Sequence, residues 1–210
     1  MRADRRRVVV ASITAAALAV LAGVIAFGAR PPALPVYWPV PEFALVDQAN
    51  DTVRTADLRG TVWLASFIFT HCTDLCPLVT HRMSDLRDSL QAQGELGTRV
   101  RLLSFSVDPA RDTPAVLREY AGKFGGSPPG EWAFLTGNDA EEIRRMIQDG
   151  FHLGAVTVAA GPGDTIAGYQ VMHSPRLLLI DQAGQVRGTY RADEPEAMRG
   201  LAADLRRLLR

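Results

Sequence analysis

The sequence contains only two cysteines, Cys72 and Cys76, among its 210 residues. Two thiols cannot form a four-cysteine zinc site, so that class of metal module is excluded. Any metal site must therefore take its remaining ligands from nitrogen, oxygen or thioether groups. Histidine is also scarce, and the chain has four of them: His71, His81, His152 and His173. The search for a metal site is thus confined to a few residues.

An excess of positive charge is missing as well. The chain has 23 basic and 23 acidic residues, and the first seven residues carry a net charge of +3, which leaves the remainder near −3. No basic stripe follows, so we expect no nucleic-acid partner. A hydrophobic content of 47% and a charged content of 22% are typical of a globular domain with a sizeable core.

Charged residues are absent from positions 8 to 27. As a helix, at about 1.5 Å per residue, this run would span about 30 Å, the thickness of the hydrocarbon core of a bilayer. The arginines before it place the N-terminal end in the cytoplasm. We therefore predict three segments before the domain: a cytoplasmic tail at 1–7, a transmembrane anchor at 8–28 and a proline-rich linker at 29–41.

A cleaved signal peptide, cut near Gly28 and Ala29, is the alternative. The apolar run is longer than the roughly 7–15 residues of a signal-peptide core, which favours the anchor. The run has no cysteine, which excludes a lipoprotein signal. Both interpretations place the domain outside the cytoplasm; with the anchor retained, it is a single-pass protein of the inner or cytoplasmic membrane, with its domain on the periplasmic or outer side.

Residues 42–210 show the pattern of one α/β domain with a mixed sheet. Apolar strand patterns occur at 62–69, 99–107 and 132–136, with hairpins at 42–55 and 176–190. Helical patterns run from the cysteines to about residue 93, and over 113–123, 138–149 and 194–210. Between 155 and 172 we expect only an extended segment with a turn. A cysteine pair directly after the first core strand narrows the prediction to a thioredoxin-like fold, a mixed central sheet flanked by helices.

The two cysteines stand where the first core strand gives way to the first long helix. The N–H groups and dipole of a first helical turn favour an anion, so we expect a thiolate here with a lowered pKa. The i, i+4 spacing predicts both sulfurs on one helix face, where they could close a disulfide or bind a soft metal ion. The alternatives are a purely structural disulfide or two buried thiols without a function, but a disulfide that closes so small a loop gives little entropic stabilisation.

His173 is the candidate for a third ligand. It precedes Ser174 and Pro175, and a proline ahead of an apolar strand is the position at which thioredoxin-like folds commonly hold a cis-proline facing the cysteines. We expect the imidazole to project towards Cys72 and Cys76. Two sulfurs and one nitrogen suit copper, and zinc is possible by ligand type. Alternatively, His173 is a loop residue bonded to backbone.

The other candidate ligands have simpler structural interpretations. We expect His71 to add local charge or to pack and His81 to lie on the helix surface, and we identify no partner for His152 from the sequence. Core packing is the default for the two nearby thioethers, Met83 and Met172. Two acidic residues complete the set of candidates: Asp74, expected to stabilise the first helical turn, and Asp108, which could reach the site or cap a loop.

These motifs together resemble the Sco/SenC family of membrane-anchored, thioredoxin-like copper proteins. The resemblance rests on the segment Phe69–Pro77 with its CxxxCP element, on Ser106–Pro114 followed by Leu117 and Tyr120, and on His173 with Ser174. It implies that Cys72, Cys76 and His173 are copper ligands, for Cu(I) or Cu(II). It also implies that the ion is delivered to the copper A site of cytochrome c oxidase subunit II, or to another exported copper acceptor.

The sequence departs from that family at two places. Thr73 stands where many members carry proline, and residues 151–170 differ from the usual approach to the histidine. Neither change touches a ligand, so the departures bear on the partner more than on the metal.

Two further functions stay open beside the copper chaperone. A thiol–disulfide oxidoreductase would use Cys72 as the attacking thiolate and Cys76 as the resolving one, keeping the cysteines of an exported protein reduced. A peroxidase would need one cysteine alone to support turnover.

Overall fold

The computed structural model describes residues 32–126, 128, 130–153 and 175–210. The predicted anchor, the segment 154–174 and His173 lie outside these residues. The chain divides into two compact units, Met1–Leu34 and Pro35–Arg210. All the described helices and strands belong to the second unit.

A five-stranded mixed sheet forms the centre of this unit, in the order β5-β4-β3-β6-β7. Its strands are β3 (Val62–Ile68), β4 (Val100–Ser106), β5 (Trp132–Leu135), β6 (Arg176–Ile180) and β7 (Val186–Arg191). The first three are parallel, β6 runs antiparallel to β3, and β7 runs antiparallel to β6. The central strand β3 is covered on both faces, which explains why it reads as an almost continuous apolar run.

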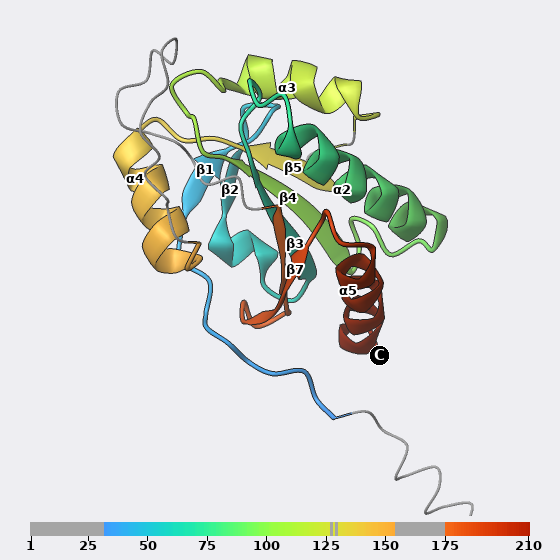
Figure 1. The fold of residues 1–210 in the computed structure, drawn as a ribbon. Coiled ribbons are helices and arrows are strands. Elements are labelled where there is room, and N and C mark those ends of the chain that lie inside the picture. Colours follow the sequence, from blue (N-terminus) through green and yellow to red (C-terminus); the bar gives the residue numbers. More distant parts are fainter. Residues whose placement is uncertain (1–31, 127, 129, 154–174) are drawn as a thin grey trace, which may run out of the picture. The chain divides into compact units, whose positions relative to one another are not determined.

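Helices cover both faces of the sheet (Figure 1). They are α2 (Leu75–Ala92), α3 (Pro114–Lys123), α4 (Ala140–Arg145) and α5 (Pro195–Leu208), with a short 3₁₀ turn, η1 (Thr55–Leu58), and a π turn, η2 (Met146–Gly150). Figure 1 shows α2, α3 and α5 on one side of the strands and α4 on the other, with the hairpin of β1 (Ala44–Val46) and β2 (Thr52–Arg54). The predicted α/β domain with a mixed sheet is confirmed.

An aromatic cluster fills the core between the sheet and the hairpin side. Trp63, Phe105 and Phe151 are almost fully buried, and their rings lie 5.2–6.5 Å apart between centroids. Phe67 stacks on Phe105 at 5.5 Å. Through Phe67 these contacts pack the C-terminal half of β3 into the core, and this half of the strand leads to Cys72.

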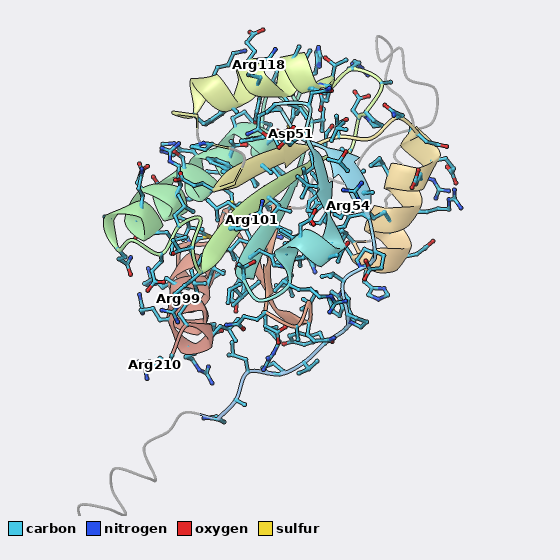
Figure 2. All side chains as sticks on the ribbon, turned by 180° about the vertical axis from the view of Figure 1, so that it is seen from behind. Asp51, Arg54, Arg99, Arg101, Arg118 and Arg210 are labelled. Carbon is cyan, nitrogen blue, oxygen red and sulfur yellow. The ribbon has the colours of Figure 1, made fainter. Side chains whose placement is uncertain are left out.

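The edge strand β5 is protected by a side chain. The amide of Gln48 donates to the carbonyl of Trp132 (2.9 Å) and accepts from the N–H of Phe134 (2.8 Å). Arg118 of α3 donates to the carbonyl of Gln48 (3.1 Å), and Figure 2 shows Arg118 and Asp51 at the same end of the molecule. The hairpin side therefore closes an edge that would otherwise offer free backbone groups.

Candidate metal centre

Cys72 and Cys76 lie at the junction of β3 and α2. Cys76 is the second residue of α2, whereas Cys72 precedes the helix, so the expectation that both stand on one helix face is wrong as stated. The loop turns Cys72 back instead, and the N–H of Cys76 donates to the Cys72 sulfur at 3.3 Å. Both are free thiols, only 7% and 6% exposed. The hydrogen bond from the Cys76 N–H to the Cys72 sulfur thus brings the two thiol side chains together at the first turn of α2.

The expected lowering of the thiol pKa is wrong for Cys76. Burial raises the pKa of this thiol far above its ordinary value, and the charges of Cys72 and Asp112 raise it further. A backbone hydrogen bond from Phe69 lowers it but does not compensate. Desolvation of the charged form therefore exceeds the stabilisation that the helix N-terminus provides. Burial therefore favours the protonated form of the Cys76 thiol.

Thr80 and Tyr120 brace the first turn of α2. The hydroxyl of Thr80 donates to the carbonyl of Cys76 (2.8 Å) and lies 2.9 Å from the hydroxyl of Tyr120. Because Thr80 has only one proton to give, Tyr120 donates to Thr80. Burial, with smaller contributions from the charges of the cysteines and Asp112, raises the pKa of Tyr120 to about 12. Helix α3 is thereby fastened to the segment that carries Cys76.

Asp112 fastens the loop that carries Cys72. This carboxylate is fully buried and accepts the hydroxyl of Thr70 (2.6 Å), the hydroxyl of Ser106 (2.5 Å) and the N–H of Thr70 (3.2 Å to Oδ2). It thus joins the end of β3 to the end of β4 and the start of α3. Its role was missed by sequence reasoning, which considered only Asp108 in this loop. Asp108 instead forms an ion pair with Arg111 at 2.9 Å.

The remaining candidate ligands that the structure describes do not gather around the thiols. His71 is exposed, with Nδ1 3.2 Å from the Thr70 hydroxyl, and His81 is exposed on α2. His152 packs edge-on against Trp38 at 5.0 Å between centroids, and Met83 is a fully buried core residue, as expected. Asp74 is the N-cap of α2 but makes no capping hydrogen bond.

Among the described residues, no third ligand lies beside the thiols. Within the described ranges, no group of three or more His, Cys, Asp or Glu side chains could hold a metal ion. His173 and Met172 lie outside those ranges, as does the peptide bond between Ser174 and Pro175. The third ligand therefore stays a prediction. The anchor also stays a prediction, because residues 8–28 lie outside the described ranges. Among the described residues, no helix is both long and apolar enough to span a bilayer.

Comparison with known proteins identifies the family. The family described as SCO1/SenC matches residues 39–210. This chain belongs to the SCO1/SenC family. The SCO1 protein homolog of Bacillus subtilis is 33% identical over 172 residues, covering 82% of this chain and 83% of the relative. Proteins of the family bind copper, and the chain has the family's thioredoxin-like α/β fold.

Two solved structures are similar over nearly their whole length. One is BsSco, described as a member of the Sco family of cytochrome c oxidase assembly proteins and as having a disulfide switch. It has a TM-score of 0.69 and 32% identity, and the alignment covers 84% of this chain and 96% of BsSco. The other is ScoI of Bradyrhizobium japonicum with copper bound, with a TM-score of 0.63 and 29% identity, covering 81% and 99%. The SCO1/SenC family thus includes both copper-bound proteins and proteins of oxidase assembly.

Proposed function

We propose that this protein is a membrane-anchored copper metallochaperone in which Cys72, Cys76 and His173 bind one copper ion. The observation that carries the proposal is the pair of free, buried thiols, joined by the hydrogen bond from Cys76 N–H to the Cys72 sulfur. Two thiols and an imidazole form a soft donor set that fits copper in either oxidation state. The copper-bound ScoI of Bradyrhizobium japonicum, 29% identical, supports the choice of metal.

The proposed acceptor is the copper A site of cytochrome c oxidase subunit II, or another exported copper protein. Copper is the cargo in this scheme. Cys72 lies in a loop between two exposed residues, His71 and Thr73, while its own side chain is only 7% exposed, so transfer to an acceptor's ligands requires this loop to open. Cys76 is held by Thr80 and Tyr120 in the first turn of α2 and keeps its place during the exchange. BsSco, as a protein of cytochrome c oxidase assembly, supports this class of partner.

The proposed membrane anchor at 8–28 would place the domain on the periplasmic or outer side. On that side the domain would share a compartment with exported copper proteins. This arrangement is tested by protease accessibility of the domain in intact spheroplasts, with a cytoplasmic protein as the control. Protection of the domain from protease would contradict it.

Copper affinity of the reduced full-length protein tests the ligand set. Cys72→Ser, Cys76→Ser and His173→Ala should each weaken binding by at least about tenfold, measured by competition with a chelator of known affinity. His81→Ala is the matched control, because it removes an exposed imidazole on the same helix as Cys76. An unchanged affinity in His173→Ala would remove the third ligand from the proposal.

Delivery needs an experiment of its own. Copper-loaded protein is mixed with the metal-free soluble domain of oxidase subunit II, and the absorption bands of copper A are followed. Formation of those bands without free copper supports the chaperone. Loading at the rate of free copper ions would contradict it.

A thiol–disulfide oxidoreductase is the second candidate, because the close sulfur pair also suits that chemistry. The thiolate of Cys72 would attack a partner disulfide, and the thiol of Cys76 would then displace the partner thiol while losing its proton. The raised pKa of Cys76 opposes fast resolution at neutral pH. Turnover with an oxidised copper A domain distinguishes the functions. Fast exchange in His173→Ala together with unchanged copper affinity would favour the oxidoreductase.

A further inference from the structure

Asp112 is a buried acid group without a cationic partner in the described part of the chain. No ion pair there joins it to a basic side chain, and its neighbour Arg111 pairs with Asp108 instead. Its acceptor capacity is satisfied by the neutral donors of Thr70 and Ser106. Buried charges in proteins are usually paired with an opposite charge or bound to a metal ion, so this exception requires an explanation.

The hydrogen-bond pattern shows that Asp112 is the acceptor. The hydroxyl of Ser106 already accepts the N–H of Asp108 (3.1 Å), so its own proton is directed to Asp112. The bonds from the two hydroxyls, 2.5 and 2.6 Å, have the length expected for a charged acceptor. The Asp112 carboxylate is therefore held against Thr70, which lies two residues before Cys72.

This carboxylate is linked to the thiol pair through the loop. The N–H of Cys76 donates to the Cys72 sulfur, so the loop that Asp112 holds through Thr70 also carries the contact between the two thiols. A metal ion bound by both thiolates would therefore lie near the loop that this carboxylate holds.

We propose that Asp112 is a positioning residue that fixes the Thr70–Cys72 turn and biases the thiol pair towards a doubly charged metal ion. The inference rests on the proposed function, since it concerns the ion held by Cys72 and Cys76. Two thiolates leave a neutral centre with Cu(II) and a net negative centre with Cu(I). The carboxylate repels only the second of these, so it favours the oxidised ion.

Asp112→Asn tests the charge while preserving the shape of the side chain. The variant should lower the ratio of Cu(II) affinity to Cu(I) affinity by about tenfold, estimated for one charge acting through a partly screened pocket. The Cu(II)/Cu(I) potential should rise by about 59 mV, the equivalent of a tenfold change in a one-electron couple. Both are measured on the full-length protein by competition titration and by redox titration followed by electron paramagnetic resonance.

Two further variants separate charge from structure. Thr70→Val removes a hydroxyl that holds Asp112 but leaves the carboxylate, so both affinities should change by similar factors and the ratio should stay. Asp181→Asn removes another buried carboxylate, at the far end of the sheet, and should leave the ratio unchanged. An unchanged ratio in Asp112→Asn, or an equal shift in Thr70→Val, would overturn the proposal.

A second pair of probe ions separates this inference from the copper function. Cadmium(II) and silver(I) are soft ions of different charge that bind thiolates. Asp112→Asn should weaken cadmium relative to silver in the same direction and by a similar factor. If the wild type binds these ions with that dependence but neither binds nor transfers copper, the proposed function fails while the charge bias stands. If copper binds but neither ratio depends on Asp112, only the inference fails.

Discussion

Two buried aspartates at opposite ends of the sheet are treated differently by the fold. Asp181, after β6, forms an ion pair with Arg187 at 2.6 Å and accepts the N–H groups of Ala183 and Gln185. Asp112, after β4, accepts only neutral donors within the described residues. The carboxylate of Asp181 is thus paired with a cation at a simple turn, whereas in the described part of the chain Asp112 accepts only from neutral groups next to the Cys72 loop.

The sheet separates these two sites. Ile180 pairs with Trp63 near the start of β3, whereas Thr70, which binds Asp112, follows its end. Seven residues at about 3.3 Å per residue place the two ends about 20 Å apart. Charge at the Asp181 turn is therefore outside the range of the thiols, and the turn serves as an internal control for the loop.

The largest effect is expected from Cys76→Ser. A hydroxyl is a poor ligand for a soft ion, so copper affinity should fall by about a thousandfold or more, measured by chelator competition on the reduced protein. The folded structure should persist, because serine keeps the size and the backbone bonds of the first turn of α2. Retention of affinity within tenfold, with a native circular dichroism spectrum, would remove Cys76 from the site.

Asp181→Asn should have the next largest effect, on stability alone. It removes the negative charge that pairs with the Arg187 guanidinium, whose side chain is only 15% exposed. The free energy of unfolding should fall by about 3 kcal/mol, the low end for broken buried pairs, because both side chains keep some exposure. Urea unfolding of the metal-free protein measures this, and copper affinity extrapolated to the folded state should not change. A change in copper affinity with no loss of stability would contradict the contrast between the two aspartates.

The sequence predicted the sheet and the cap of α3 well, because both depend on local patterns. The hydroxyl of Thr113 accepts the N–H of Val116 (3.4 Å), and Pro114 is the first residue of α3, as expected from the order of these residues. The apolar run of β3 likewise ends at Ile68, one residue before the predicted end. Cap chemistry and strand burial are short-range properties that a sequence expresses directly.

The site was less predictable, because its geometry depends on contacts between distant residues. The helix starts at Leu75, so Cys72 reaches Cys76 through a loop and not along a helix face. The sign of the Cys76 pKa shift depends on how deeply the thiol is buried, and spacing alone does not reveal this. Asp112 and Thr70 are 42 residues apart in the sequence, and no local motif predicts their hydrogen bond.

The raised pKa of Cys76 predicts a pH dependence of copper binding. Copper binds the thiolate, and below the pKa of the thiol each binding event must release its proton. Affinity should therefore fall by about tenfold for each unit by which the pH drops and for each proton released, from pH 8 down to pH 6. Proton release on copper addition, measured in weak buffer, gives the number directly. A flat affinity over this range would mean that the thiols are already ionised in the metal-free protein.

Tyr120→Phe should give the smallest effect and tests how the first turn of α2 is held. The hydrogen bond from Tyr120 to Thr80 is lost, so the free energy of unfolding should fall by about 1 kcal/mol at pH 7. The pKa of Tyr120 is raised from 10.0 to about 12, so between these values the unfolded chain ionises first and the folded state loses stability. This alkaline loss should be smaller in the variant, and its stability should approach that of the wild type as the pH rises. The two effects are measured by urea midpoints of both proteins at pH 7, 10 and 11.

A constant difference in stability between the two proteins across that range would mean that the phenol is not shielded by the fold. Because the variant leaves Asp112 and both thiols in place, the ratio of Cu(II) to Cu(I) affinity should stay near the wild-type value, which separates bracing of the turn from the charge behind it.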